Sequence, residues 1–185
     1  VRAAKTGMLH NAAVINAVAD ALPEKGPCLV VDPVMVSTSG AALLEKDAVS
    51  CLRDRLFPRA ALITPNLPEA EMLLGRKIRS LENMADAAVR MSREWGCDCL
   101  VKGGHLKGGS EEILDAACMG GEVFFLGSPC VRGSKASHGT GCTFSAAFAA
   151  ALALGFSTAR ALCAAKEFVY GSLVEEVEPG EGVHA

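Results

Sequence analysis

The segment from His138 to Thr143, with the sequence HGTGCT, holds the residue types best suited to chemistry in this chain. Its two glycines, Gly139 and Gly141, let the backbone approach a ligand closely. A predicted helix over Thr143 to Leu154 follows, and the first N–H groups of a helix are unpaired and positively polarised. The segment therefore indicates an anion site suited to a phosphoryl group in transfer. A plain glycine-rich helix entry is the alternative, and the spacing alone favours neither.

Cys142 lies at the start of this predicted helix. The positive end of the helix dipole favours its thiolate form, which makes the sulfur a better base or nucleophile. A cysteine hydrolase would need a histidine to activate the thiol, and His138 or His105 would have to serve. That mechanism gives no task to the charged residues described next, so we rank it last.

Asp32, Thr64 and Lys102 each come directly after a short apolar run. A lysine followed by two glycines can reach phosphate oxygens as a point charge. The plainer alternatives are a surface lysine in a turn and an aspartate that initiates a turn before proline.

Asn66 and Glu69 lie at the start of a short predicted helix, Pro68 to Leu74. The pair could hold a hydrated Mg²⁺, which keeps several waters and needs few carboxylates. Taken alone, an acidic first helical turn is the favoured interpretation, because such turns are common.

Short apolar runs and amphipathic stretches alternate along the chain. The runs predict parallel strands buried on both faces, and the alternation predicts right-handed βαβ units with helices on both sides of the sheet. Two further runs separated by Gly120 and Gly121 predict an antiparallel hairpin at one edge. The predicted strands are 28–31, 61–63, 99–101, 112–118 and 122–126, and the predicted helices are 9–22, 47–56, 68–74, 81–95, 143–154 and 157–174.

The predicted sheet explains how distant residues could form one site. The carboxyl ends of parallel strands share one edge of a sheet, and ligands of open α/β sheets bind there. Asp32, Thr64 and Lys102 all follow predicted strands. We therefore expect them to line one site.

Composition narrows the class of protein. The chain has 185 residues, half of them apolar, which favours one globular domain over 1–185 and excludes disorder. Its net charge of −3 argues against nucleic-acid binding through bulk positive charge. No apolar tract is long enough to cross a membrane. The eight cysteines contain no C-x-x-C and several lie in apolar runs, which favours reduced thiols and a cytoplasmic protein.

These residues together resemble a known family. The segments Gly139–Cys142, Asn66–Glu69 and Val101–His105 resemble the ribokinase-like superfamily. Three longer stretches, Lys5–Leu9, Val30–Gly40 and Leu62–Glu71, resemble the hydroxymethylpyrimidine and phosphomethylpyrimidine kinases of thiamine biosynthesis. The resemblance implies a three-layer α/β/α ribokinase-like fold. It also implies ATP-dependent phosphorylation of 4-amino-5-hydroxymethyl-2-methylpyrimidine, and then of its monophosphate.

The resemblance also implies a role for each site residue. Cys142 would be the general base, and the amides of Gly139, Thr140 and Gly141 would hold the transferring phosphoryl group. Lys102 would neutralise the ATP phosphates.

The nucleotide and metal positions follow in the same way. Thr64 and Asn66 would contact ATP, while Asp32 and Glu69 would organise Mg²⁺ and its waters. Met8 and Val34, with Cys142, match positions that line the pyrimidine pocket.

Two departures from the family pattern accompany the resemblance. The family's N-terminal portion, with at least one core strand and polar contacts to the pyrimidine, is expected to be missing before Val1. Ser137 stands where the family usually has threonine, which keeps the hydroxyl. A pyridoxal kinase of the cysteine-containing type and a catalytically inactive fragment stay open as alternatives. The family also implies a homodimer with a small-molecule substrate.

Overall fold

One mixed sheet forms the centre of the computed structural model, which describes residues 1–36, 43–104, 111–131 and 139–175. Across these residues six strands follow each other in chain order; β1 to β4 are parallel, and β5 and β6 are antiparallel. The strands are β1 (Ala3–Thr6), β2 (Cys28–Val31), β3 (Leu62–Ile63), β4 (Asp98–Val101), β5 (Glu112–Met119) and β6 (Glu122–Pro129).

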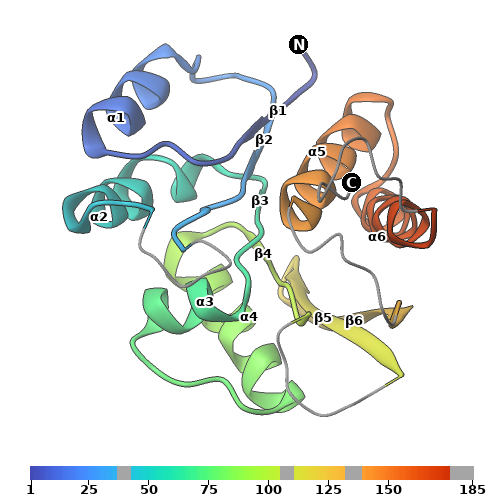
Figure 1. Ribbon diagram of the computed structural model, residues 1–185. Helices are drawn as coiled ribbons and strands as arrows, with labels where there is room; N and C mark the ends of the chain where they lie inside the picture. Colours follow the sequence, from blue (N-terminus) through green and yellow to red (C-terminus); the bar gives the residue numbers. More distant parts are fainter. Residues whose placement is uncertain (37–42, 105–110, 132–138, 176–185) are drawn as a thin grey trace, which may run out of the picture.

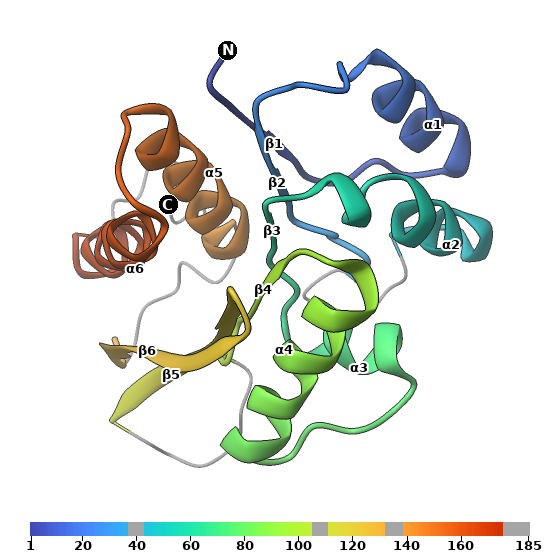
Figure 2. The ribbon, with the colours of Figure 1, turned by 180° about the vertical axis from the view of Figure 1, so that it is seen from behind.

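Helices cover both faces of this sheet, which makes three layers (Figures 1 and 2). Four helices lie on one face: α1 (Ala12–Ala21), α2 (Lys46–Arg55), α3 (Leu67–Leu74) and α4 (Leu81–Trp95). The other face carries α5 (Thr140–Ala153) and α6 (Thr158–Val174). A short 3₁₀ turn, η1 (Phe57–Arg59), follows α2. The predicted three-layer architecture with a hairpin at one edge is confirmed.

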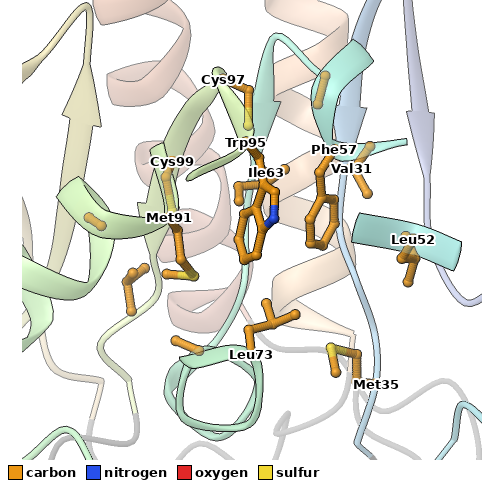
Figure 3. Packing of buried hydrophobic residues seen from close by; sticks show 14 of the residues in the cluster. Val31, Met35, Leu52, Phe57, Ile63, Leu73, Met91, Trp95, Cys97 and Cys99 are labelled. Atoms are coloured by element: carbon orange, nitrogen blue, oxygen red, sulfur yellow. The ribbon is translucent and has the colours of Figure 1, made fainter. Parts of the chain in front are cut away.

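The alternation of side chains along the strands divides the core into two clusters. Val31 faces the four-helix side, where it joins Leu52, Phe57 and Trp95 (Figure 3). The rings of Phe57 and Trp95 lie 4.7 Å apart between centroids. Val30, the preceding residue, faces α5 and α6 instead. Because neighbouring strand residues are both buried, the runs are continuously apolar, as a strand covered on both faces requires.

The predicted helices are present with small shifts at their ends. The helix over Leu81–Trp95 has the predicted bounds. Two starts shift by three residues: α1 begins at Ala12 rather than Leu9, and α5 begins at Thr140 rather than Thr143, after Gly139 at a φ of 83°. This earlier start places Gly141 and Cys142 inside the first helical turn.

Two features of the sheet differ from the prediction. β1 is not among the predicted strands, because its four residues end in the polar Lys5 and Thr6 and are only half-buried. β6 continues to Pro129, three residues beyond the predicted end, because its whole length pairs with β5. Within the described ranges, no helix combines the length and apolar character needed to cross a membrane.

Candidate active site

The carboxyl edge of the parallel strands gathers Asp32, Thr64 and Lys102, as the sequence predicts. Lys102 Nζ donates to Asp32 Oδ1 at 2.9 Å, and Thr64 Oγ1 donates to the same oxygen at 3.3 Å. The Asp32 side chain is 2% exposed and that of Lys102 16%. The ion pair is therefore largely shielded from solvent. In this environment of low polarity, its charges act more strongly than they would in water.

The first turn of α5 lies against this ion pair. A Cβ atom added at Gly141 would lie 2.7 Å from Lys102 Nζ, so the end of the lysine side chain would have to shift away. Glycine at this position therefore lets the ammonium approach the unpaired N–H groups of the helix. The lysine and the helix start together concentrate positive charge at one point, where an anion is favoured.

Ser145 connects the helix to Asp32 and was not singled out from the sequence. Its Oγ lies 3.3 Å from Asp32 Oδ2 and 3.0 Å from the carbonyl oxygen of Cys142, either of which can accept its proton. Ser145 is fully buried. The sequence feature that could have indicated Ser145 as a site residue is its hydroxyl, which interrupts an apolar tract three residues after Cys142.

Asn66 and Glu69 form a capping box at the start of α3. Glu69 N donates to Asn66 Oδ1 at 2.9 Å, and Asn66 N donates to Glu69 Oε2 at 2.8 Å. The second carboxylate oxygen, Oε1, accepts from Met35 N at 3.0 Å. Glu69 thus caps the helix, as the favoured interpretation expects, and also holds the segment after β2.

The buried position of Glu69 affects its protonation. Burial raises the pKa of its carboxyl above the ordinary value, and the nearby Lys102 ammonium and the N–H groups of Asn66 and Met35 partly oppose this rise. The neighbouring charge of Asp32 adds to it. Glu69 therefore lies within electrostatic reach of the Lys102–Asp32 pair.

The donor set fits a hydrated magnesium ion and not a closed metal cage. Among the described residues, no group of three or more histidine, cysteine, aspartate or glutamate side chains could hold a metal. Both oxygens of Glu69 already accept backbone N–H groups, and Asp32 accepts from Lys102. Asp32 Oδ1 accepts two hydrogen bonds, whereas Asp32 Oδ2 and the two oxygens of Glu69 accept at most one each and keep a second lone pair. Two such carboxylates suit an ion that keeps several of its waters.

The three predicted pyrimidine-pocket residues lie at element ends on the same edge of the fold. Met8 follows β1 and is 55% exposed, and Cys142 is exposed in the first turn of α5. Val34 follows β2 with a φ of 40°. A β-branched residue in the left-handed region costs on the order of 1–3 kcal/mol, and such strain concentrates at functional sites.

A cavity of about 130 Å³ opens beside Lys102. Its walls come from the hairpin, from the start of α5 and from the second half of α6. Apolar groups dominate the walls, which include Phe144, Val169, Tyr170 and Leu173. His105, His138 and Ser137, considered above from the sequence, lie outside the described residues.

Comparison with known proteins identifies the family. All residues from 1 to 185 match the family model described as phosphomethylpyrimidine kinase. The chain belongs to this family. A hydroxymethylpyrimidine/phosphomethylpyrimidine kinase of Rhizobium meliloti is 43% identical over 98% of this chain and 68% of its own length. The resemblance drawn from the sequence is confirmed.

Solved structures agree with the fold. The ADP complex of Bacillus subtilis pyridoxal kinase is 33% identical, with a TM-score of 0.86 over all of this chain and 68% of that one. Phosphomethylpyrimidine kinase of Clostridium difficile is 33% identical, with a TM-score of 0.78 over 93% of this chain and 69% of that one. The predicted ribokinase-like fold is confirmed.

The chain spans only part of its relatives. It covers 34% of a bifunctional thiamine biosynthesis protein of Geobacter sulfurreducens, to which it is 44% identical over 91% of its own length. It covers 66–68% of several kinases of the family.

Proposed function

We propose that this chain carries out ATP-dependent phosphorylation of 4-amino-5-hydroxymethyl-2-methylpyrimidine, and then of its monophosphate, in thiamine biosynthesis. The observation that carries the proposal is the Lys102 ammonium, held between Asp32 and the first turn of α5 at Gly141. Family membership and relatives named as hydroxymethylpyrimidine/phosphomethylpyrimidine kinases support the choice of substrate.

The residues divide the work of phosphoryl transfer, which depends on positioning and charge neutralisation more than on covalent chemistry. Lys102 and the amides of Gly139, Thr140 and Gly141 stabilise the charge on the transferring group. Cys142, exposed beside these amides, acts as a thiolate and accepts the proton of the substrate hydroxyl while the hydroxyl oxygen bonds to the phosphorus. The bond to the ADP leaving group breaks in the same step.

Magnesium would be held through water by Asp32 and Glu69, near the ATP phosphates. When bound, the ion neutralises charge on the phosphate oxygens. Asn66, which follows β3, lies at the same edge and completes the nucleotide site, while the fully buried Thr64 supports the site through its hydrogen bond to Asp32. The apolar cavity beside Lys102, lined by Phe144 and Tyr170, suits the flat face of the adenine base.

The proposal also includes a cytoplasmic location and a homodimer. Eight free cysteines suit a reducing cytoplasm. A homodimer is supported by the edge strand β6, where Val123 and Phe125 are 43% and 46% exposed. Light scattering of the purified chain measures the oligomeric state.

Pyridoxal phosphorylation is the second candidate, favoured by the pyridoxal kinase structure of TM-score 0.86. The hydroxymethyl group of pyridoxal would meet the same Cys142. The third possibility is an inactive fragment that keeps only nucleotide binding.

A coupled assay of ADP release distinguishes the pyrimidine kinase, the pyridoxal kinase and the inactive fragment. The chain is given ATP and Mg²⁺ with hydroxymethylpyrimidine, its monophosphate or pyridoxal in separate reactions. We expect turnover with the two pyrimidines and a lower rate with pyridoxal. Turnover with pyridoxal alone would move the assignment to the second candidate, and nucleotide binding without any turnover would indicate the inactive fragment.

The Cys142→Ser variant separates a kinase from a cysteine hydrolase. A kinase that uses Cys142 as base loses much of its turnover and keeps its affinity for ATP. General acid–base catalysis contributes about 10²–10⁴-fold, which sets the scale of the expected loss. A chain that hydrolyses an ester substrate only with Cys142 intact, and never binds ATP, would contradict the proposal.

A further inference from the structure

A buried ion pair between β5 and α6 takes no part in the mechanism above. Lys166 Nζ on α6 lies 2.7 Å from Asp115 Oδ2 on β5. Their side chains are 10% and 5% exposed, and both belong to the wall of the cavity beside Lys102. Replacing a buried pair with apolar residues is often neutral or stabilising, so such a pair calls for a reason beyond stability.

The second oxygen of Asp115 reaches the turn after β4. Asp115 Oδ1 accepts from Gly103 N at 2.8 Å, and Gly103 directly follows Lys102. On the other side, a Cβ atom at Gly103 would lie 1.8 Å from the carbonyl oxygen of Leu114. The backbone next to Lys102 is therefore pressed against β5 and held there by a buried carboxylate.

We propose that Asp115 and Lys166 are positioning residues that hold Lys102 at the phosphate site. Lys166 supplies the counter-charge to the buried Asp115 carboxylate, which holds Gly103 N. The fixed backbone at Gly103 restricts the position of the neighbouring Lys102 backbone. It thereby restricts where the Lys102 ammonium lies relative to the first turn of α5. The phosphate role of Lys102 in this inference rests on the proposed function.

The Lys166 ammonium also neutralises the negative charge of Asp115 beside the cavity. Asp115, Lys166 and Lys102 line one cavity. Without Lys166, an uncompensated carboxylate would line the nucleotide cavity beside Lys102, and its negative charge would repel the phosphates that Lys102 is to hold. Turning Asp115 toward solvent would relieve its burial and break its bond to Gly103.

Removing the Lys166 charge tests the proposal with two readouts. In Lys166→Met, we expect the dissociation constant for ADP with Mg²⁺ to rise about tenfold or more, because an unpaired buried charge is left beside the site. We also expect faster hydrogen exchange at the Gly103 amide, measured below the unfolding temperature. Lys166→Arg restores both values toward those of the unmodified chain.

Lys77→Met is the matched control, because Lys77 is also paired to a carboxylate, Glu71, at 2.7 Å but is 71% exposed. We expect ADP affinity and Gly103 exchange to stay unchanged in this variant. A folded Lys166→Met chain with unaltered ADP affinity and unaltered Gly103 exchange would overturn the proposal.

A double variant, Lys166→Met with Asp115→Asn, covers the case in which the single variant does not fold. Asparagine keeps an oxygen to accept from Gly103 N and carries no charge. We expect this chain to fold, to protect the Gly103 amide and to recover most of the ADP affinity. Fast exchange at Gly103 in the folded double variant would contradict the proposal. If the unmodified chain binds no ADP, the proposed function fails, and Gly103 exchange alone then decides whether the pair positions this turn.

Discussion

Gly141 sets how closely the positive charge of Lys102 approaches the start of α5. The Cβ of any other residue would lie 2.7 Å from the ammonium nitrogen, so the lysine would have to move. The glycine matters here for the space it leaves to its neighbour and not for a left-handed backbone. The ion pair with Asp32 fixes the ammonium from the other side.

The Gly141→Ala variant is expected to weaken nucleotide binding without unfolding the chain. Displacing Lys102 loses a charge-assisted contact, which is worth about 1.5–3 kcal/mol, or roughly ten- to a hundredfold in the KM for ATP. Steady-state kinetics and thermal unfolding measure the two effects. Gly171→Ala on α6 is the control, because its Cβ would meet nothing within 4 Å. An unchanged KM for ATP in Gly141→Ala would contradict this role.

Glu69 is predicted to make stability depend on pH. Burial raises the pKa of its carboxyl in the folded chain. The folded chain therefore binds more protons than the unfolded chain between the two pKa values, and the free energy of unfolding falls as pH rises through that window. The window begins near the ordinary glutamate value, about pH 4.

Glu69→Gln removes this titration. Glutamine accepts only one of the two backbone N–H bonds, which costs about 1–3 kcal/mol at any pH. We expect the stability of the unmodified chain, minus that of the variant, to fall as pH rises above about 4 and then to level off. Urea unfolding from pH 4 to 7 measures the difference. A difference that stays constant with pH would show that Glu69 does not titrate abnormally.

The sequence reveals site residues that stand at element ends and misses those inside elements. Asp32 and Lys102 were predicted to meet because each follows an apolar run, and they form an ion pair. Ser145, Asp115 and Lys166 were not predicted to join the site. They lie within α5, β5 and α6, and their positions depend on how those elements pack against one another.

At the scale of elements, the contact between β4 and β5 determines the position of the turn that follows β4 and contains Lys102. β5 runs antiparallel to β4, and the turn after β4 passes directly over the backbone of Leu114. Gly103 makes this passage possible.

Gly103→Ala is expected to disrupt this contact, because its Cβ would lie 1.8 Å from the carbonyl oxygen of Leu114. The strands would have to separate locally, which we expect to cost about 1–3 kcal/mol or more. Gly104→Ala, whose Cβ would meet nothing within 4 Å, is the matched control. Chemical denaturation of both variants measures the cost, and equal stability of the two would refute this account of the β4–β5 contact.

Element positions were predicted where local patterns are strong. Continuous apolar runs gave β2, β3 and β4, and amphipathic spacing gave α4 with its bounds. The start of α5 was placed three residues late, because Gly139 to Gly141 are poor helix formers in isolation. The close approach of Lys102 to Gly141, made only in the fold, favours the earlier start.

At the scale of the whole molecule, two apolar clusters on opposite faces hold one sheet in place. The cluster under the four helices contains Cys97, Cys99 and Cys118, while Cys142 at the site is exposed. Burial raises the pKa of the Cys97 thiol to about 12 and that of Cys99 well above its ordinary value. The thiols of the core and the thiol of the site should therefore differ in reactivity.

Thiol labelling of the native chain at pH 8 tests this distinction. We expect iodoacetamide to modify Cys142 and the other exposed thiols, and to leave Cys97, Cys99 and Cys118 unmodified until the chain unfolds. Peptide mass spectrometry identifies the modified positions. Labelling of the three core thiols under native conditions would show that the four-helix layer does not close over the sheet.

The central claim is that Lys102 and the start of α5 form a nucleotide phosphate site, and calorimetric titration with ADP and Mg²⁺ tests it most directly. We predict saturable binding to the unmodified chain. Lys102→Met should raise the dissociation constant by roughly ten- to a hundredfold, as the loss of a charge-assisted contact implies. Equal affinity of the two chains, or no binding by the unmodified chain, would contradict the account.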